Sequence, residues 1–404
     1  MKEGNASSTN RGALLLLSMN LFIIMVGIGL VIPILPYYVE KFGANAQVLG
    51  ALVAVYSFMQ FIFAPIWGKW SDRIGRKPLI TIGLFGFAIA EFLFAFALDV
   101  WMLFISRIVA GLFGSALMPT AMAYVSDVTS EEKRGQGMGV LGAAMGLGFV
   151  IGPGVGGFLA EWDLSVPFIV AGIAGGIAGV VSFFVLPESY PKEKRSGGDC
   201  HHSMRQGQLT LIRQALKSSV GLLFILVFFM SFGLANFQSI FGYYTYTRYG
   251  FGPKDVGLVI LVIGLIGTVI QGVGVGKLTQ RFGEEKVVKG SFLLSAFGFL
   301  LMIMAIDFFT VLVTTSIFYV GNAFLRPSLN AYISKKAGQQ QGFVMGLNNS
   351  FMSLGNVIGP LLAGTLFEWN IHIPYVFGAL IMLVGFGSLL LWRKKEANII
   401  STHS

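Results

Sequence analysis

Long apolar runs alternate with short polar stretches along almost the whole chain. The run from Leu79 to Leu98 is interrupted by a single charge, Glu91, which lies midway along its predicted span. Because a helix of about 20 apolar residues crosses ~30 Å of hydrocarbon, such runs predict transmembrane helices. Twelve spans are predicted, near residues 13–35, 48–70, 78–97, 100–124, 135–160, 166–186, 218–246, 254–278, 286–306, 309–333, 340–366 and 373–392.

An internal repeat divides these spans into two sets of six. Eight residues recur at one constant spacing, with Gly139, Gly148, Gly152, Pro153, Gly157, Glu161, Trp162 and Pro167 matching Gly346, Gly355, Gly359, Pro360, Gly364, Glu368, Trp369 and Pro374. In an apolar chain, such a repeat is typical of carriers whose substrate site lies between two halves. We therefore expect an all-α membrane protein with twelve transmembrane helices in two pseudo-symmetric six-helix bundles.

The bundles are predicted at residues 1–190 and 218–404, and a cytoplasmic central loop at residues 191–217 joins them. Hydrophobicity collapses across that loop. Cys200, His201 and His202 adjoin there, but three adjacent residues cannot close a four-coordinate metal site alone. A polar linker is the better interpretation, and neither a metal nor a cofactor is expected.

Composition places the chain in a bilayer. Hydrophobic residues make up 55% and charged residues 12% of the sequence, and mean hydropathy is +0.75. Soluble domains carry about 25% charged residues. The first apolar segment has no small-residue cleavage site and is interpreted as a retained span, not a signal peptide. The single cysteine excludes an intramolecular disulfide.

The net charge of +9 is unevenly distributed. With both termini placed in the cytoplasm, the inner loops and tails hold most Lys and Arg residues, and the outer loops hold only Lys41, Arg248 and Lys254. This distribution follows the positive-inside rule. It indicates an orientation in the membrane and not a nucleic-acid-binding surface.

A dense group of charges follows the second span, from Gly68 to Lys77. We expect a very short inner loop in which Gly68 and Gly75 let the chain turn and Asp72 lies against a helix N-terminus. The cations there can face lipid head groups or an acidic partner. The second half keeps the glycines but has Gln280 in place of the carboxylate. The alternative is a loop that only sets the topology.

Small residues form a stripe on the fifth span. Gly148, Gly152 and Gly156 share one face, and Pro153 removes a helix hydrogen bond. Such a stripe lets another backbone approach closely. It serves as a tight structural interface, as a surface on which the halves move, or as both.

These motifs resemble those of the major facilitator superfamily over all twelve predicted spans. The Gly68–Lys77 loop resembles its hallmark motif, and the first and fourth spans carry similar motifs at Gly27–Pro36 and at Arg107-x3-Gly111. The fifth span resembles the antiporter motif of drug:proton exporters through Gly139, Gly148, Gly152, Pro153, Gly156 and Gly157. The chain is most similar to the quinolone and multidrug exporters of Gram-positive bacteria, which implies a bacterial cytoplasmic membrane.

The resemblance implies inward- and outward-facing states and a latch on the inner side. In the family, the Asp of the hallmark motif meets the eleventh helix, and the Arg meets an acid that ends the fourth helix. The latch residues carried over to this chain are Gly68, Asp72, Arg73, Gly75, Arg76 and Asp127. Protonating a carboxylate in such a latch weakens it.

Charges inside the predicted spans are candidates for function because burying them in a bilayer is unfavourable. They are Glu91, Arg107 and Arg326. We take Glu91, Arg107 and Asp127 as candidates for proton coupling, although Glu91 could instead only satisfy a neighbouring helix. The guanidinium of Arg107 does not titrate, but it can influence a nearby carboxylate or pair with an anionic substrate.

Similar exporters carry carboxylates on the seventh and tenth spans, whereas this chain has none at the corresponding positions. This departure favours neutral, zwitterionic or anionic cargo over lipophilic cations. The candidate cavity residues are Asn20, Tyr56, Gln60, Arg107, Asn236, Phe237, Gln238, Tyr243, Asn322, Arg326 and Asn356. Tyr56, Gln60, Arg326 and Asn356 rank first because they match drug-site positions of the similar exporters.

Together these observations predict a secondary active transporter that exports small amphipathic compounds, antibiotics among them, in exchange for protons. We expect a monomer surrounded by membrane lipids. The alternative is a dedicated exporter of a neutral or anionic metabolite, such as a siderophore or glycolipid, with altered or absent proton coupling. A membrane enzyme is disfavoured because the spans offer no His, Cys or paired carboxylates. A channel is also disfavoured, and the chain lacks a phosphate-binding loop for ATP.

Overall fold

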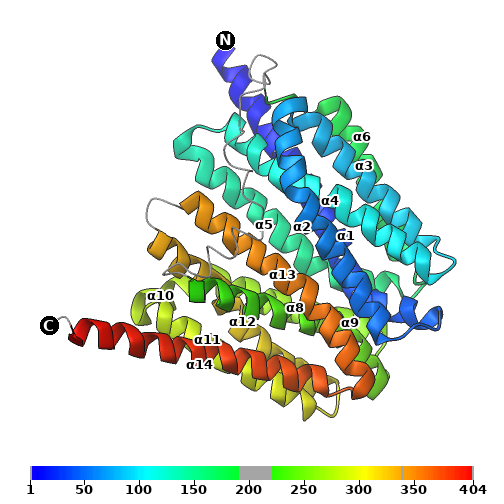
Figure 1. Cartoon of the computed structure of the whole chain (residues 1–404). Coiled ribbons are helices and arrows are strands. Elements are labelled where there is room, and N and C mark those ends of the chain that lie inside the picture. Colours follow the sequence, from blue (N-terminus) through cyan, green and yellow to red (C-terminus); the bar gives the residue numbers. More distant parts are fainter. Residues whose placement is uncertain (1, 191–220, 338–340, 403–404) are drawn as a thin grey trace. The chain divides into compact units, whose positions relative to one another are not determined.

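The computed structural model describes residues 2–190, 221–337 and 341–402, which are almost entirely helical. The elements are α1 (Lys2–Lys41), α2 (Ala46–Ile74), α3 (Arg76–Ala95), α4 (Val100–Val128), α5 (Glu131–Leu159), α6 (Val166–Val185), α8 (Gly221–Tyr249), α9 (Pro253–Val269), η3 (Ile270–Gly274), α10 (Val275–Phe282), α11 (Glu284–Ile303), α12 (Phe308–Ala337), α13 (Gln341–Trp369) and α14 (Ile373–Thr402) (Figure 1). By length and composition, 12 spans in these described residues can cross a membrane. The predicted all-helical membrane fold is confirmed, while the central loop with Cys200, His201 and His202 lies outside the described residues.

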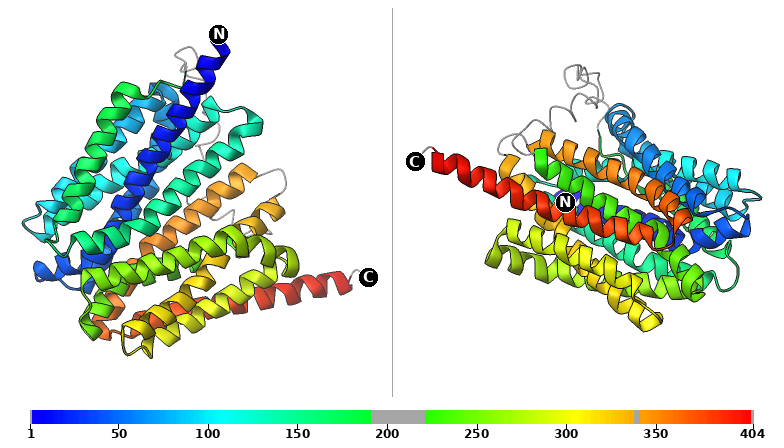
Figure 2. Two further views of the ribbon diagram at one scale, coloured as in Figure 1. Left: turned by 180° about the vertical axis from the view of Figure 1, so that it is seen from behind. Right: turned by 60° about the horizontal axis from the view of Figure 1, so that its bottom comes forward.

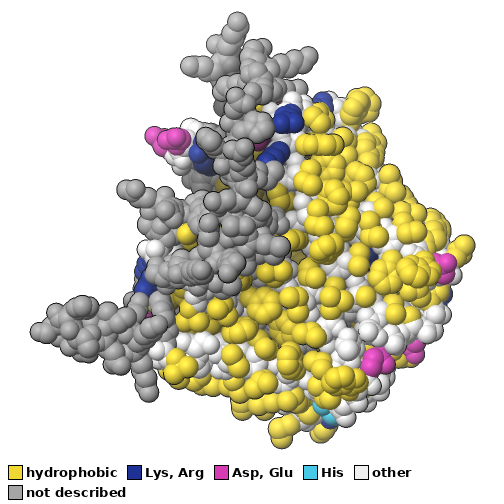
Figure 3. Space-filling model, viewed as in Figure 1, with side chains coloured by type: hydrophobic (Ala, Val, Ile, Leu, Met, Phe, Trp, Pro, Cys, Tyr) yellow, Lys and Arg dark blue, Asp and Glu magenta, His cyan; other side chains and the backbone are white. Residues whose placement is uncertain are grey.

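The described residues form two compact units. Unit 1 holds the residues up to 44, residues 55–190 and residues 251–261, and unit 2 holds residues 45–54, residues 221–250 and the residues from 262 onward. The division therefore follows the repeat except for two short segments, at the starts of α2 and α9. Hydrophobic side chains cover most of the described surface visible in Figure 3, as hydrocarbon surroundings require.

In unit 1, α1 runs along α5 (Figure 2). The glycine stripe makes this contact possible, because a Cβ on Gly148 would lie 2.6 Å from Phe22 O and a Cβ on Gly152 would lie 2.6 Å from Val26 O. Gly139 differs, since a Cβ there would meet nothing within 4 Å. Most of the stripe is thus a close α1–α5 interface.

Unit 2 repeats the same contact between α8 and α13. A Cβ on Gly355 would lie 2.8 Å from Phe228 O, and a Cβ on Gly359 would lie 2.8 Å from Phe232 O. The glycines recur along the sequence because each unit needs the same close approach of two helices.

A π-helical turn, η3, interrupts the eighth span, which was predicted as continuous over 254–278. The equivalent glycines Gly75 and Gly283 are separated in the sequence by one residue more than the equivalent glycines Gly139 and Gly346 are. Because a π turn accommodates one residue more than an α turn, η3 absorbs this extra residue without shifting the rest of the helix.

The turn between α2 and α3 is shorter than predicted. Helix α2 continues to Ile74, so Gly68 lies inside a helix and does not turn the chain. Gly75 alone separates α2 from α3, with a φ of 111° that side chains disfavour. Gly283 occupies the equivalent position between α10 and α11, with a φ of 80°.

Candidate functional site

Arg76, the first residue of α3, is the centre of a polar cluster at this turn. Its Nε donates to Asp127 Oδ2 of α4 at 3.0 Å, and its Nη1 donates to Asp72 Oδ1 at 2.6 Å and also to Ser71 Oγ. The Arg76 side chain is 6% exposed, whereas the Asp72 side chain is 60% exposed. Arg73 is exposed. The structure therefore brings three of the predicted latch residues together around one buried guanidinium.

The segment that follows α6 closes over this cluster. Glu188 Oε1 accepts the backbone N–H of Arg76 at 2.9 Å, and Ser189 Oγ donates to Asp127 Oδ2 at 3.0 Å. The ring of Tyr190 lies 4.5 Å from Arg76 Cζ, a cation–π contact. These residues were not predicted, because in sequence they look like the start of a polar linker.

A second cluster is buried between α3 and α4. Ser106 Oγ donates to Ala90 O at 2.8 Å and fixes the register of the two helices. The residues that follow each of these, Glu91 and Arg107, are therefore neighbours, and they interact electrostatically. Glu91 is 2% exposed and Arg107 is 5% exposed.

The buried charges do not satisfy each other. Glu91 Oε2 and Arg107 Nε and Nη2 have no hydrogen-bond partner within the described part of the chain. Arg107 instead places its guanidinium over Phe94, 4.6 Å from the ring centroid. Glu91 lies nearer to the Ala95 end of α3 than to the middle, where the sequence had placed it. A carboxylate and a guanidinium are thus both buried and held close together without a direct ion pair.

The fourth-span motif has a structural reason. A Cβ on Gly111 would lie 2.7 Å from Tyr56 O, so only glycine lets α4 and α2 approach this closely. The approach brings Tyr56 near both Glu91 and Arg107. Gln60 Nε2 donates to the hydroxyl of Tyr56 at 2.8 Å. Tyr56, Glu91 and Arg107 are called the buried cluster below.

In unit 2, Arg326 of α12 is exposed. It interacts electrostatically with Tyr319, and Tyr319 shares a side-chain hydrogen bond with Gln238 of α8. Asn356 and Tyr243 are half-buried, and the Tyr243 ring lies 5.3 Å from that of Phe367. These side chains remain candidates for contact with a ligand.

Four other cavity candidates lie in helix packing. Asn20 Nδ2 donates to Ser182 Oγ at 2.8 Å, and Asn236 Nδ2 donates to Pro374 O at 2.8 Å. Asn322 is 6% exposed and donates hydrogen bonds to one residue of α11 and one of its own helix, α12. Phe237 is 1% exposed and lies in an aromatic cluster. We leave these four residues out of the proposed ligand surface.

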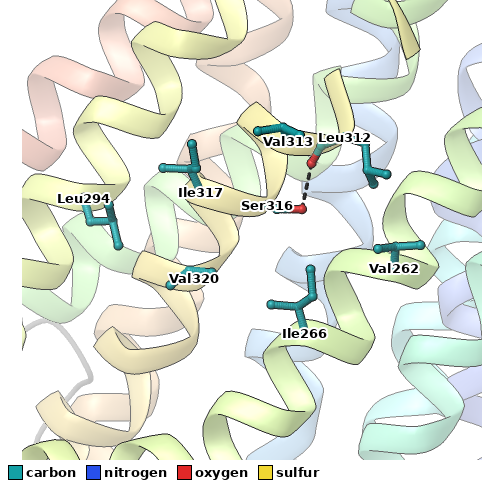
Figure 4. Close-up of a pocket in the computed structure, with 8 residues that line it drawn as sticks. All are labelled: Val262, Ile266, Leu294, Leu312, Val313, Ser316, Ile317 and Val320. Carbon is teal, nitrogen blue, oxygen red and sulfur yellow. Dashed lines mark hydrogen bonds between the residues drawn. The ribbon is translucent and has the colours of Figure 1, made fainter. Parts of the chain in front are cut away.

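An apolar groove of about 400 Å³ lies on unit 2 among α9, α11 and α12 (Figure 4). Its lining residues are Val262, Ile266, Leu294, Leu312, Val313, Ser316, Ile317 and Val320. The single hydroxyl there, of Ser316, donates to Leu312 O at 2.7 Å. The groove therefore offers no free polar group that could hold a proton or a charged substrate.

A repeated set of membrane-spanning helices with buried charges in the spans is typical of secondary transporters of small molecules. The chain belongs to the Major Facilitator Superfamily, whose sequence model matches residues 17–275 and 223–402. The two matched ranges overlap over residues 223–275 and together reach into both halves of the chain.

Known relatives resemble the chain over nearly its full length. It is 36% identical over 382 residues to Multidrug resistance protein 2 of Bacillus subtilis (strain 168), covering 95% of each chain. It is 32% identical over 380 residues to the Quinolone resistance protein NorA of Staphylococcus aureus (strain COL), covering 94% of this chain and 96% of that protein. The crystal structure of the human organic anion transporter MFSD10 (TETRAN) shares the fold, with a TM-score of 0.68 at 24% identity over 94% of this chain and 99% of that chain.

Proposed function

We propose that this transporter exports small amphipathic compounds, drugs among them, across a bacterial cytoplasmic membrane in exchange for protons. Both termini face the cytoplasm, the protein acts as a monomer among lipids, and the two halves alternate between inward- and outward-facing states. The names of the multidrug and quinolone resistance relatives support this assignment. The observation that carries the proton coupling is the buried cluster, where Glu91 and Arg107 lie close together with unsatisfied polar atoms.

Glu91 is the proton carrier in this proposal, and Arg107 is its electrostatic partner. When Glu91 is ionised, the two charges compensate each other, and when it is protonated, Arg107 carries an uncompensated charge. Because buried charges interact strongly, proton binding changes the field that a ligand meets. Asp127 acts separately, through the Arg76 cluster.

The direction of coupling restricts the cargo. A cargo group that is positive or donates hydrogen bonds competes with the proton for Glu91. Cargo and proton then bind in turn and cross the membrane in opposite directions. Binding of an anionic cargo group at Arg107 is instead favoured by protonation of Glu91. Cargo and proton then bind together and cross the membrane in the same direction. An exchanger therefore needs cargo whose donor or amine approaches the buried cluster.

The Arg76 cluster acts as the inner latch in this proposal. Its ion pairs with Asp72 and Asp127 stabilise one of the two states, and protonation of a carboxylate releases it. Asp72→Asn should alter the transport rate in vesicles while expression stays normal. Unchanged transport would remove the latch from the mechanism.

A second candidate function is export of a neutral or anionic metabolite with weak or absent proton coupling. The exposed guanidinium of Arg326 beside Tyr319 and Gln238, with amides where similar exporters have acids, favours it. The pH dependence of cargo affinity separates the two functions, because exchange requires affinity to rise as protons leave the protein.

The test is transport in proteoliposomes under an imposed pH gradient, with a quinolone, a neutral dye and a cationic dye as substrates. Wild-type protein should accumulate substrate against its gradient. Glu91→Gln should keep substrate counterflow but lose the response to the pH gradient. Glu132→Gln, which removes an exposed carboxylate of α5, is the matched control and should behave as wild type. A full pH response in Glu91→Gln overturns the assignment.

A further inference from the structure

Two helices begin in one unit and continue into the other. Residues 45–54, at the start of α2, cluster with unit 2, and residues 251–261, at the start of α9, cluster with unit 1. Their first helical residues, Ala46 and Pro253, are separated by the same number of residues as the repeated glycines of the two halves. Each unit therefore holds the start of a helix whose remainder belongs to the other unit.

The unit 2 clasp is the contact of the start of α2 with the end of α13. A Cβ on Gly364 would lie 3.0 Å from Gln47 Cα, and a Cβ on Gly50 would lie 3.4 Å from Gly364 Cα, so the backbones touch. Glu368 Oε1 accepts the backbone N–H of Ala46 at 2.8 Å. The carboxylate thus satisfies a free N–H at the positive end of a helix.

The unit 1 clasp is the equivalent contact of the start of α9 with the end of α5. A Cβ on Gly157 would lie 3.0 Å from Lys254 Cα, and a Cβ on Gly257 would lie 3.2 Å from Gly157 Cα. Pro253 has no N–H to donate. The repeat carboxylate, Glu161, instead pairs with Lys254 Nζ at 3.1 Å. The same position fastens both clasps by different chemistry.

Movement of the units must either bend these helices or separate the clasps. Between Gly50 and Pro65, α2 contains no glycine or proline, and sharp kinks need such residues or a π turn. In α9 the π turn η3 lies beyond the unit boundary, at Ile270–Gly274. The stiff part of α2 therefore leaves its docking surface before it bends, whereas α9 also contains Gly264 and Gly267 beyond the unit boundary and has more freedom to bend.

We propose that Glu161 and Glu368 fasten the two clasps and that both clasps release together when the units exchange states. This inference rests on the proposed function in one respect, that the units move against each other. It needs neither a proton carrier nor a particular substrate. The glutamate that recurs near the end of each repeat then has a role that the transport mechanism had left unexplained.

The test is the labelling rate of buried reporter cysteines in the full-length protein, with Cys200→Ser as background and a maleimide as probe. Ala46→Cys reports on the unit 2 clasp and Val256→Cys on the start of α9, because both side chains are fully buried, each with 0% exposure. Glu368→Ala should raise labelling at both reporters about fivefold, as expected for loss of a helix cap. Glu161→Gln should raise both about two- to threefold, as expected for an exposed pair.

Lys254→Met gives an independent test, because it leaves Glu161 in place and should raise labelling as much as Glu161→Gln does. The double variant should add nothing further. High salt should act like Glu161→Gln, since the side chains of this pair are 40% and 48% exposed. Glu132→Ala, at the far end of α5, is the control and should leave both rates unchanged.

A rise confined to the reporter beside the altered carboxylate overturns the joint release, and no rise at either reporter overturns the clasps altogether. The proposed function fails by a different result. Loss of pH-driven transport in the wild-type protein, with labelling as expected here, would contradict proton coupling and leave the clasps standing.

Discussion

Glu284, the first residue of α11, forms an ion pair with Lys335 of α12. The equivalent positions of the first half hold Arg76 and Asp127, which are paired at 3.0 Å. The repeat has therefore kept the pair and exchanged its signs. A helix–helix contact of this kind depends on opposite charges and not on which helix carries which sign.

The two pairs differ in burial, and this difference predicts unequal effects of removing them. The Arg76 side chain is 6% exposed, whereas that of Lys335 is 67% exposed. Arg76→Gln should destabilise the protein by about 1–3 kcal/mol, because Asp127, whose side chain is 20% exposed, loses its charged hydrogen-bond donor. Lys335→Gln should cost less than about 1 kcal/mol. Thermal unfolding in detergent measures both, and equal shifts would contradict the assignment.

The fold was predictable because span length and the repeat are properties of the sequence itself. The Arg76–Asp127 pair was accessible too, through the resemblance of the loop to a known motif. The contacts of Glu188 and Tyr190 could not be predicted. They join the segment after α6 to the start of α3, and nothing in the sequence indicates that these two distant segments meet.

Polar residues within spans were the least reliable guide to the site. Asn236 reads as a cavity residue, but its amide donates to Pro374 O at the start of α14. A buried amide is equally suited to satisfy a backbone carbonyl, and only the packing decides between the two. The equivalence of the two clasps could have been predicted from the sequence, because Ala46 and Pro253 are separated by the same number of residues as the repeated glycines.

The approach of α2 to α4 predicts a strong effect at Gly111. A Cβ there would lie 2.7 Å from Tyr56 O and 2.7 Å from Met59 Cβ. Gly111→Ala should force the helices apart, destabilise the protein by about 1–3 kcal/mol and displace Tyr56 from the buried cluster. Transport in vesicles should fall together with the unfolding temperature.

The matched control is Gly139→Ala, where a Cβ would meet nothing within 4 Å. That change should be neutral or stabilise the helix by up to about 1 kcal/mol, because alanine favours the helix more than glycine does. If both variants behave alike, the close approach at Gly111 has no energetic importance.

His372 predicts a pH-dependent stability. Burial and the nearby charge of Arg248 lower the pKa of His372 below its ordinary value. Its Nδ1 lies 3.2 Å from the hydroxyl of Tyr244. Because the folded protein then binds the proton less readily than the unfolded chain, stability should be complete above the ordinary pKa of about 6.5 and fall as pH drops through the lower folded value.

The measurement is the unfolding midpoint of the purified protein between about pH 8 and 5, on either side of the ordinary pKa of histidine. His372→Gln should lose this part of the pH dependence and keep a hydrogen-bonding side chain. An identical pH profile in the variant would show that another group is responsible.

Permanently charged lipophilic cations should be poor substrates. The buried cluster has one ionisable acid, Glu91, opposed by Arg107, and Arg326 is a further positive charge in unit 2. A zwitterion brings its own anion to offset these guanidinium groups, whereas ethidium does not. Efflux from loaded cells should therefore be at least tenfold faster for a zwitterionic quinolone than for ethidium, about 1.4 kcal/mol in transition-state terms. Arg326→Gln should narrow this difference in efflux rate by improving ethidium efflux. Rapid proton-driven ethidium efflux by the wild-type protein would contradict the charge argument.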